Sequence, residues 1–373
     1  MREKGTLLRK GEGALSLSGW SLGAAIRPAT DTTRQFDATY CRSLGSTSSC
    51  STDKADNTDL IQWSKDNLSG KTTKYTYDKA NRLTKVATDG GGKTYTYTYD
   101  ARGNRKTSSD GSADQSLAFD TANQITSDGY TYDAQGNQTK AAKLSIVTYD
   151  GTNRMVSAKT STGTSRYTYA GEDANELVSQ TSDEGEKTSY VYGAPDQYGM
   201  PVIEQVQLKE GTAHIDHDPT TGQPLALRTT NGYEAYYIVD GIGNPVQFIN
   251  QSTVQSTIYD YDPYGTVQTT KETGTAGTQN PYRFVVGTYD KTTGYVKFGQ
   301  RWYGPTTGRF TTQDKLSFLG DPARGNRYAY AGGDPINNSD PTASIRSMTS
   351  NLMSGSLARL QRSAELLVVL QIL

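Results

Sequence analysis

The stretch that decides the fold runs from Arg301 to Asp314 and reads RWYGPTTGRFTTQD. Short aromatic pieces alternate in it with turn pieces built on glycine, proline and threonine. The alternation continues upstream through NPYRF at 280–284 and YDKTTGY at 289–295, and downstream through NRYAY at 326–330 and DPINNSDP at 334–341. Punctuated aromatic pieces of this kind predict short strands joined by turns.

A shorter pattern recurs between Tyr75 and Tyr264: a Tyr-Asp pair is followed, three residues after the Asp, by Gly or Asn. Most successive copies lie 20 to 23 residues apart, which is the signature of a structural repeat. Degenerate copies include the His-Asp pair at 217–218 and VDGIGNPV at 239–246. The residues assigned to the clearest repeat turns are Asp78, Asp100, Gly103, Asp133, Gly136, Asp262 and Gly265.

Each copy predicts a β-hairpin. In Tyr95 to Tyr99 tyrosine and threonine alternate, so the tyrosines line one face of a strand. The next residues, Asp100 to Gly103, fit a type I turn in which the Asp carboxylate accepts amide hydrogens and Gly adopts positive φ. Where Asn replaces Gly, the left-handed position stays accessible; these copies carry Asn81, Asn123, Asn153 and Asn175. We therefore predict an all-β antiparallel ribbon, with helix confined to short pieces after Asp314 and in the C-terminal tail.

Composition narrows the function classes. The 373 residues include 26 Tyr against 7 Phe, and the net charge is −1 without a basic stripe, so no nucleic-acid partner is expected. Cys41 and Cys50 are either incidental or one local disulfide, since two cysteines make neither a framework nor a metal site. The longest apolar run, 366–373, is too short to span a membrane. The N-terminus lacks the apolar segment of a signal peptide, so we expect the chain to be exported as part of a larger protein or with a partner.

The repeats and the motifs at 280–341 resemble those of Rhs proteins (YD-repeat proteins), of the insecticidal Tc toxin C component and of teneurins. The resemblance covers about residues 71–343 and implies a ribbon that spirals into a partial β-shell capped by a core segment. It divides the chain into an irregular lead-in at 1–70, YD repeats at 71–263, an Rhs core at 264–343 and a variable tail at 344–373. A strand or two are expected in the lead-in, near 15–26 and 59–63, and a short amphipathic helix in the tail.

The resemblance also implies a function. Members of the toxin branch encapsulate and deliver a polymorphic toxin, so the expected partner is the C-terminal toxin of this chain or of a parent chain, and the expected location is the cell surface or the exterior. The tail here is too short to be an effector enzyme. The alternative from another class is a teneurin-like adhesion or carbohydrate-binding module that recognises cell-surface glycans through its tyrosine-rich strands.

The chemistry that the resemblance implies is self-cleavage by an aspartic protease. Carried over by motif, Arg301 heads the first core piece, Asp314 matches the first catalytic carboxylate and Asp340 the second, with the cut near Ser344. Two close carboxylates suit this role because one keeps a proton while the other activates water. The sequence departs from the family pattern at Gly304, at Lys315 and in the final motif, DPTAS where the family has Asp-Pro-x-Gly-Leu. We expect the three residues to converge, and the altered end to leave the chain largely uncut.

Two other clusters carry weaker signals. His214 to Asp218 holds two His and two Asp, but His217 stands in a repeat slot and adjacent residues of a strand point to opposite faces, so a metal site is not favoured. Gly241 to Gly243 lacks the third glycine and the helix of a phosphate-binding loop, and is interpreted as a turn. No cofactor is predicted.

Overall fold

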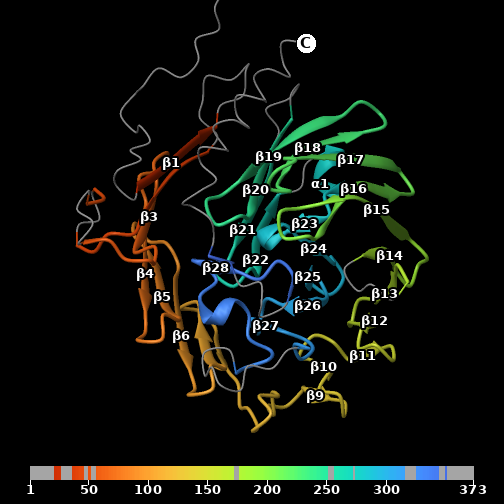
Figure 1. Ribbon diagram of the computed structural model, residues 1–373, viewed down its shortest axis with the longest axis horizontal. Helices are drawn as coiled ribbons and strands as arrows, with labels where there is room; N and C mark the ends of the chain where they lie inside the picture. Colours follow the sequence, from red (N-terminus) through yellow and green to blue (C-terminus); the bar gives the residue numbers. More distant parts are fainter. Residues whose placement is uncertain are drawn as a thin grey trace, which may run out of the picture. The chain divides into compact units, whose positions relative to one another are not determined.

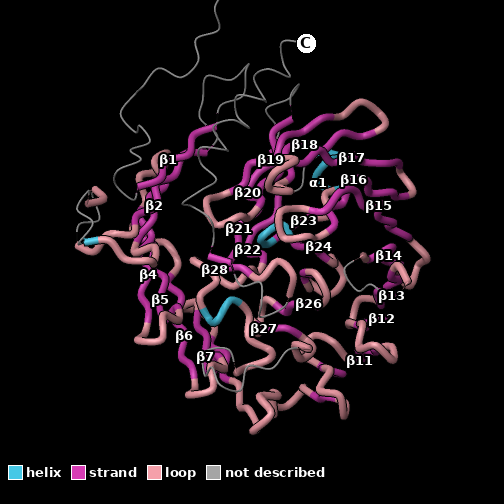
Figure 2. The backbone as a smooth tube through the Cα atoms, viewed as in Figure 1, coloured by secondary structure: helices cyan, strands magenta, loops and turns pink. Residues whose placement is uncertain are grey.

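The computed structural model describes residues 21–26, 36–45, 49–51, 56–171, 176–250, 256–271, 274–315, 325–343 and 349–350. The structure is 48% strand and 4% helix, which confirms the all-β prediction (Figure 2). The chain divides into two compact units, which are described separately. The first comprises Met1–Thr76, Ala87–Gly92 and Met353–Leu373, and the second comprises Tyr77–Val86 and Lys93–Leu352.

In the first unit, successive strands pair antiparallel. They are β1 (Ser21–Ile26), β2 (Phe36–Cys41), β3 (Trp63–Asp66) and β4 (Thr72–Tyr77), whose last residue belongs to the second unit. The strand expected near 15–26 is present as β1 in the described residues 21–26. Of the strand expected near 59–63 only Trp63, the first residue of β3, is in a strand, and β2 carries no clear sequence signal. The proposed boundary of the lead-in at residue 70 stays a prediction.

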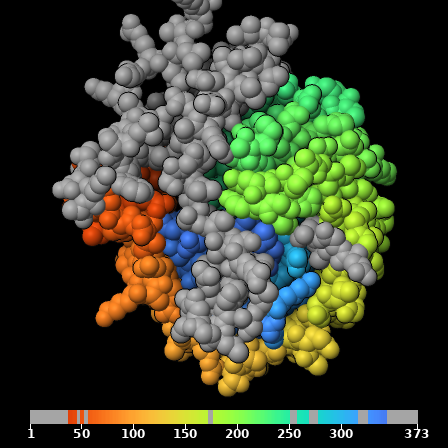
Figure 3. Space-filling view, in the orientation of Figure 1, coloured from red at the N-terminus to blue at the C-terminus, as the bar shows by residue number. Residues whose placement is uncertain are grey.

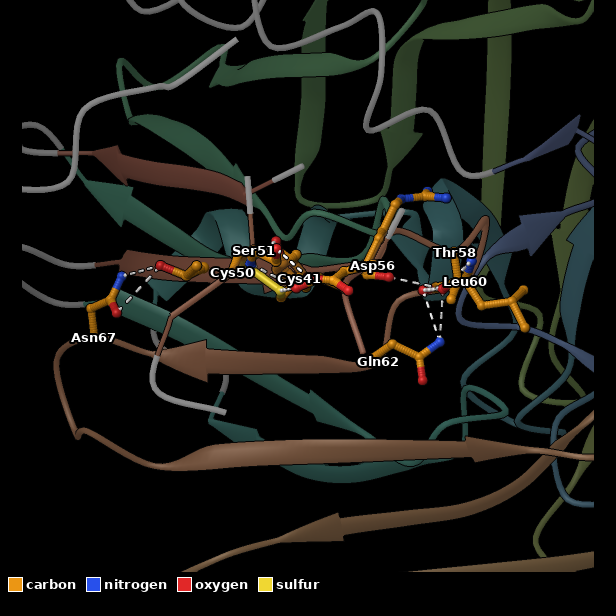
Figure 4. The surroundings of a disulfide bond; sticks show 12 residues. Cys41, Cys50, Ser51, Asp56, Thr58, Leu60, Gln62 and Asn67 are labelled. Atoms are coloured by element: carbon orange, nitrogen blue, oxygen red, sulfur yellow. Dashed lines mark hydrogen bonds between the residues drawn. A yellow bond between two sulfur atoms is a disulfide. The ribbon is translucent and has the colours of Figure 1, made fainter. Parts of the chain in front are cut away.

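Cys41 and Cys50 form a disulfide at the end of β2 (Figure 4). Cys41 is fully buried, and the Ser43 hydroxyl beside it accepts the amide hydrogen of Ser51 at 2.9 Å. The Thr58 hydroxyl, further along the loop, accepts from the Gln62 amide at 2.9 Å. Of the two alternatives for these cysteines, the structure has the local disulfide.

The second unit begins with hairpins and continues into a 12-stranded sheet whose strands pair antiparallel in chain order (Figure 1). The hairpin strands are β5 (Leu83–Thr88, whose last two residues belong to the first unit), β6 (Thr94–Tyr99), β7 (Arg105–Ser109), β8 (Asp114–Ser116), β9 (Thr131–Tyr132) and β10 (Gln138–Lys140). The sheet contains β11 (Ile146–Tyr149), β12 (Met155–Lys159), β13 (Thr164–Tyr169), β14 (Leu177–Thr181), β15 (Lys187–Pro195), β16 (Pro201–Leu208), β17 (Gly211–His217), β18 (Pro224–Thr229), β19 (Glu234–Val239), β20 (Pro245–Asn250), β21 (Ser256–Tyr261) and β22 (Val267–Lys271). The sheet is open, with β11 and β22 at its edges.

The repeat turns have the predicted chemistry. Asp100 Oδ1 accepts the amide hydrogens of Arg102 and Asn104, each at 2.9 Å, and the amide of Gly103 donates to the Asp100 carbonyl. Gly103, Gly136 and Gly265 have φ of 79°, 82° and 89°, as predicted. Asn81, Asn123 and Asn153 take the same conformation, with φ of 59°, 63° and 64°, whereas Asn175 lies outside the described residues.

Tyrosine hydroxyls tie several of the hairpins to the preceding one. Tyr99 donates to the Leu83 carbonyl at 2.7 Å, Tyr169 to Met155 at 2.7 Å and Tyr261 to Pro245 at 2.9 Å. In each case the tyrosine immediately precedes the first residue of its turn, and the acceptor follows the turn of the preceding copy. This bond explains why the repeats use Tyr where Phe would supply the same apolar ring.

The core segment adds α1 (Gly274–Gln279), β23 (Tyr282–Arg283), β24 (Gly287–Tyr289), β25 (Val296–Phe298), β26 (Arg301–Gly304), β27 (Arg309–Phe310) and β28 (Asn338–Ser339), with β29 (Thr349–Ser350) pairing with β28. Here the prediction that helix is confined to short pieces after Asp314 and in the C-terminal tail is wrong. Both α1 and a 3₁₀ turn at Phe284–Val286 precede Asp314, while one at Ala331–Gly333 follows. The amphipathic helix expected in the tail lies outside the described residues. The sequence of α1, GTAGTQ, gives no helical signal because six residues with two glycines show neither propensity nor period.

Strands β23 to β27 form a five-stranded antiparallel sheet, and some of its aromatic side chains pack on the 12-stranded sheet. Tyr282 and Trp302 belong to the same buried cluster as Tyr167, Tyr190 and Tyr237 of the large sheet. In the space-filling view the green residues of β15 to β18 form a continuous surface (Figure 3). The core segment is therefore held by side chains from one face of the repeat strands.

Candidate functional site

The structure brings Arg301, Asp314 and Asp340 together, as the sequence predicts. Arg301 Nη2 donates to Asp314 Oδ2 at 2.9 Å and lies 3.6 Å from Asp340 Oδ2. The three residues are 5%, 2% and 2% exposed. Two carboxylates, 26 residues apart in sequence, thus share one guanidinium nitrogen in a water-poor environment. We call Arg301, Asp314 and Asp340 the acid pair site.

Backbone pairing explains the convergence. Arg301 opens β26, which pairs with β27, and β27 continues towards Asp314. The segment after Asp314 returns alongside, since the Phe310 amide donates to the Tyr328 carbonyl and the Asp314 amide to the Arg327 carbonyl, both at 2.9 Å. Asp340 reaches Arg301 from a third segment, the turn that carries this aspartate.

Arg301 has a second set of bonds, to backbone carbonyls. Its Nε donates to the Ala343 carbonyl at 2.7 Å and its Nη1 to the Arg327 carbonyl at 2.9 Å, while the guanidinium lies 3.7 Å from the centre of the Phe310 ring. Burial lowers the pKa of Arg301 to about 10, although the charges of Asp314 and Asp340 oppose this effect and raise the pKa. The residue therefore stays charged at neutral pH and polarises the carbonyl that it binds.

That carbonyl belongs to the residue before the predicted cut. Ala343 is buried with φ of 51°, a left-handed conformation that costs a residue with a Cβ roughly 1–2 kcal/mol. The family motif has Gly at this position, so the substitution identified from sequence falls where the backbone needs positive φ. Gly299 lies against the same turn, since a Cβ there would clash with the backbone of Thr342. Ser344 itself lies outside the described residues.

The other sequence candidates are not assembled into a site. His217 faces the core segment, where its Nε2 lies 3.2 Å from the Tyr282 hydroxyl. His214, three residues earlier on β17, is the cross-strand partner of Arg228 on β18. Gly243 donates its amide to the Asp240 carbonyl, so Gly241 to Gly243 belongs to a repeat turn. Within the part of the chain that the structure describes, no group of three His, Cys, Asp or Glu could hold a metal ion.

Three contacts of the core were not anticipated. The Tyr328 hydroxyl donates to the Gly136 carbonyl at 2.6 Å, across 192 residues. Tyr167 and Ser165 both donate to the buried Asp290 carboxylate, the Ser165 bond at 3.1 Å. The third is the bond from Arg301 to Ala343. The motifs NRYAY and YDKTTGY mark two of these positions, but no local pattern reveals their long-range partners.

A shallow depression of about 450 Å³ lies on the large sheet and is lined by His214, Arg228, Thr229, Gly232, Tyr233 and Glu234. Arg228 forms an ion pair with Asp216 at 2.5 Å, and both side chains are about half exposed. The depression is distant in sequence from the acid pair site and offers a solvated, charged surface. Among the described residues, no helix has the length and apolarity needed to cross a membrane.

Tandem Tyr-Asp hairpins, packed by their tyrosines on a core segment that brings two aspartates onto one arginine, define a YD-repeat protein. The family model "Teneurin YD-shell" matches residues 47–336. The chain belongs to this family.

The relatives that the chain resembles are much longer proteins. The tRNA3(Ser)-specific nuclease WapA of Bacillus spizizenii is 29% identical over 295 residues, which are 71% of this chain and 11% of that protein. The salivary gland surface protein 1 of Aedes aegypti is 31% identical over 129 residues, which are 33% of this chain and 4% of that protein. The chain spans about a tenth or less of the length of these relatives.

Solved structures of Tc toxin complexes share the fold. The crystal structure of TcdB2-TccC3-Cdc42 superposes with a TM-score of 0.65 at 15% identity, covering 87% of this chain and 18% of that chain. A Tc holotoxin pore of Photorhabdus luminescens gives a TM-score of 0.64 at 14% identity, and the match covers 86% of this chain and 17% of that chain. At this identity the likeness establishes the fold alone.

Proposed function

We propose that this chain is the shell-and-core part of a YD-repeat toxin carrier, and that it encloses a C-terminal toxin of its own or of a parent chain. The observation that carries the proposal is the docking of the core segment on the repeat turns, exemplified by Tyr328 on Gly136. The match to WapA nucleases over most of this chain supports it, because those relatives extend far beyond the matched part. Absence of an effector in the tail remains part of the proposal.

The test is protection of a passenger. An unstructured reporter peptide is fused after Leu373, and its digestion by an added protease is compared with that of the free reporter. We expect slower digestion of the fused reporter. Gly136→Val should remove the protection, because a Cβ at Gly136 would clash with the Gln313 amide, whereas a Cβ at Gly103 meets nothing within 4 Å and Gly103→Val is the control. Equal digestion of fused and free reporter would contradict the enclosure.

The disulfide supports export. Cysteines pair stably in oxidising compartments, and Cys41–Cys50 closes a loop in the first unit. In this proposal the chain works at the cell surface or outside the cell as part of an exported protein. Glycan binding, the adhesion alternative, remains a prediction to be checked by a glycan-array screen of the purified chain.

A second candidate function is self-cleavage at the acid pair site, favoured by the bond from Arg301 to the Ala343 carbonyl. One carboxylate takes a proton from water, and the water oxygen attacks the Ala343 carbonyl carbon. Arg301 stabilises the oxyanion that forms. The other carboxyl protonates the departing amine of Ser344 as the C–N bond breaks.

Intact mass measurement of the incubated chain tests this candidate. We expect wild type to remain largely uncut, because Ala343 and Ser344 replace the Gly and Leu of the family motif. The double variant Ala343→Gly, Ser344→Leu should release the C-terminal peptide, and adding Asp314→Asn should prevent release while leaving the chain folded. Release that persists in this triple variant would refute the catalytic role of Asp314.

A further inference from the structure

The acid pair site has a buried hydroxyl beside it that the reaction above does not use. Tyr330 is 1% exposed, and no side chain or carbonyl among the described residues accepts its hydroxyl hydrogen. Its ring is fixed by close aromatic neighbours, with centroids 4.5 Å from Tyr303 and 5.5 Å from Phe298. A phenol this deeply buried normally donates to a partner, either in the protein or in an ordered water.

Tyr330 belongs to the same buried cluster as Ala343, which lies three residues after Asp340. Burial raises the pKa of Tyr330 well above its ordinary value, and the charge of Asp340 raises it further. The backbone of Asp340 opposes this effect and lowers the pKa, but the phenol stays protonated. The ring of Tyr330 also packs on Phe310, at 5.9 Å, and Phe310 carries the guanidinium of Arg301 on its face. Tyr330 thus lies in the same packed group as the acid pair site.

A second buried hydroxyl occurs in the turn that carries Asp340. The Oγ1 of Thr342 is buried without a hydrogen-bond partner among the described residues. The backbone around it is fixed, because the Ala343 amide donates to the Asp340 carbonyl at 3.1 Å and Arg301 binds the Ala343 carbonyl. Thr342 is two residues from Asp340, whose carboxyl is also buried. Buried hydroxyls without protein partners are the groups to which an internal water molecule binds.

We propose that Tyr330 is a positioning residue that holds a water molecule against the Asp340 carboxyl, and that this water is the nucleophile for the bond after Ala343. The assignment rests on the self-cleavage candidate above. The water gives its hydrogen to an ionised carboxylate of the pair as its oxygen bonds to the Ala343 carbonyl carbon. Tyr330 donates to the water oxygen in the ground state and restricts its position relative to the carbonyl.

The two carboxylates differ in their distance from the arginine. Asp314 accepts a hydrogen bond from Arg301 at 2.9 Å, whereas Asp340 is 3.6 Å from the same nitrogen. In the proposed arrangement the water lies beside Asp340, while the hydrogen bond from Arg301 orients Asp314. One carboxylate of the pair receives the proton of the water, and the other, as the carboxylic acid, supplies the proton for the leaving amine. A tyrosine at position 330 is therefore required for its hydroxyl as well as for its ring.

The first experiment measures release in the Ala343→Gly, Ser344→Leu background. Tyr330→Phe keeps the ring, so the fold should survive, and the rate constant of release should fall about 10- to 100-fold with a changed pH profile. Tyr303→Phe is the matched control: its hydroxyl donates to the Tyr264 carbonyl at 2.7 Å, away from the acid pair. Tyr303→Phe should leave the pH profile as it is. An unchanged rate and pH profile in Tyr330→Phe overturns the positioning role.

The second experiment does not depend on cleavage. A crystal structure of the Asp314→Asn chain should contain a water within about 2.7–3.2 Å of both Tyr330 Oη and an Asp340 oxygen. Tyr330→Phe in that variant should remove it. No water at this position overturns the proposal. If the water is present but the Ala343→Gly, Ser344→Leu chain is never cut, the self-cleavage candidate fails together with the nucleophile role, and the site is a structural water only.

Discussion

Acidification should weaken the fold through one histidine. His217 ends β17, and its Nε2 lies 3.2 Å from the Tyr282 hydroxyl, with the two rings edge to face. The same hydroxyl accepts the Ile203 amide hydrogen at 3.1 Å, so its own proton is directed to the lone pair of the imidazole. A protonated His217 cannot accept that hydrogen, and its charge is disfavoured by burial, so protonation weakens this contact between the large sheet and the core segment.

Burial lowers the pKa of His217 from 6.5 to about 4, opposed by the backbone of Ile215 and the charge of Asp216. The unfolded chain therefore binds more protons than the folded chain between these values. The stabilising contribution is complete above pH 6.5 and is lost as the pH falls towards 4. Full loss corresponds to about 3 kcal/mol of unfolding free energy.

Urea unfolding of wild type and His217→Gln at about pH 7.5 and about pH 4.5 measures this contribution. Gln keeps an acceptor for Tyr282 but does not titrate, so the variant should lose about 2–3 kcal/mol less than wild type between the two pH values. His214→Gln, on the same strand but without the contact to Tyr282, is the control, since the chain contains only these two histidines. If His217→Gln and wild type lose the same free energy, the assignment is wrong.

Three further predictions concern backbone and charge. Gly136→Ala should destabilise the protein more than Gly103→Ala by about 1–3 kcal/mol. Both glycines have positive φ, but only a Cβ at Gly136 clashes with neighbours, Gln313 and Tyr328. Thermal unfolding of the two variants measures the difference. Ala343→Gly should raise the unfolding free energy by about 1 kcal/mol in urea, as strain at φ of 51° is relieved, and unchanged stability would mean the turn relaxes. Arg301→Leu should cost about 3–5 kcal/mol at neutral pH, since two buried carboxylates lose their counter-ion; a loss below about 1 kcal/mol would argue against the ion pairs.

Local chemistry explains which parts of the fold were predictable. Asp100 and Gly103 interact within one turn, so the turn, its positive φ and the hairpin follow from the sequence alone. Convergence of Arg301 with Asp314 and Asp340 was predictable only because the core motifs resemble a family with that arrangement. The short strands and turns between them allow the return but do not specify it.

Features set by distant contacts could not be predicted. Helix α1 forms from six residues without helical signal, and β18 supplies its packing. His217 occupies a repeat slot as a substitute for Tyr, and nothing nearby in sequence indicates that Tyr282 faces it. The buried hydroxyl of Tyr330 is likewise invisible in the motif NRYAY, because its significance depends on Asp340 and on the aromatic rings that surround it.

The repeats and the acid pair site are coupled through the segment that contains Tyr328. Its hydroxyl binds the carbonyl of Gly136, a turn residue of the repeats, while the adjacent Arg327 carbonyl binds Arg301. Just after β27, the Thr311 carbonyl accepts the amide hydrogen of Gln138, two residues after that turn, at 2.9 Å. A change at Gly136 therefore displaces both segments that position Arg301. The geometry of the acid pair depends on the repeat turn as much as on its own residues, so self-cleavage, if restored, should be lost in Gly136→Val and retained in Gly103→Val.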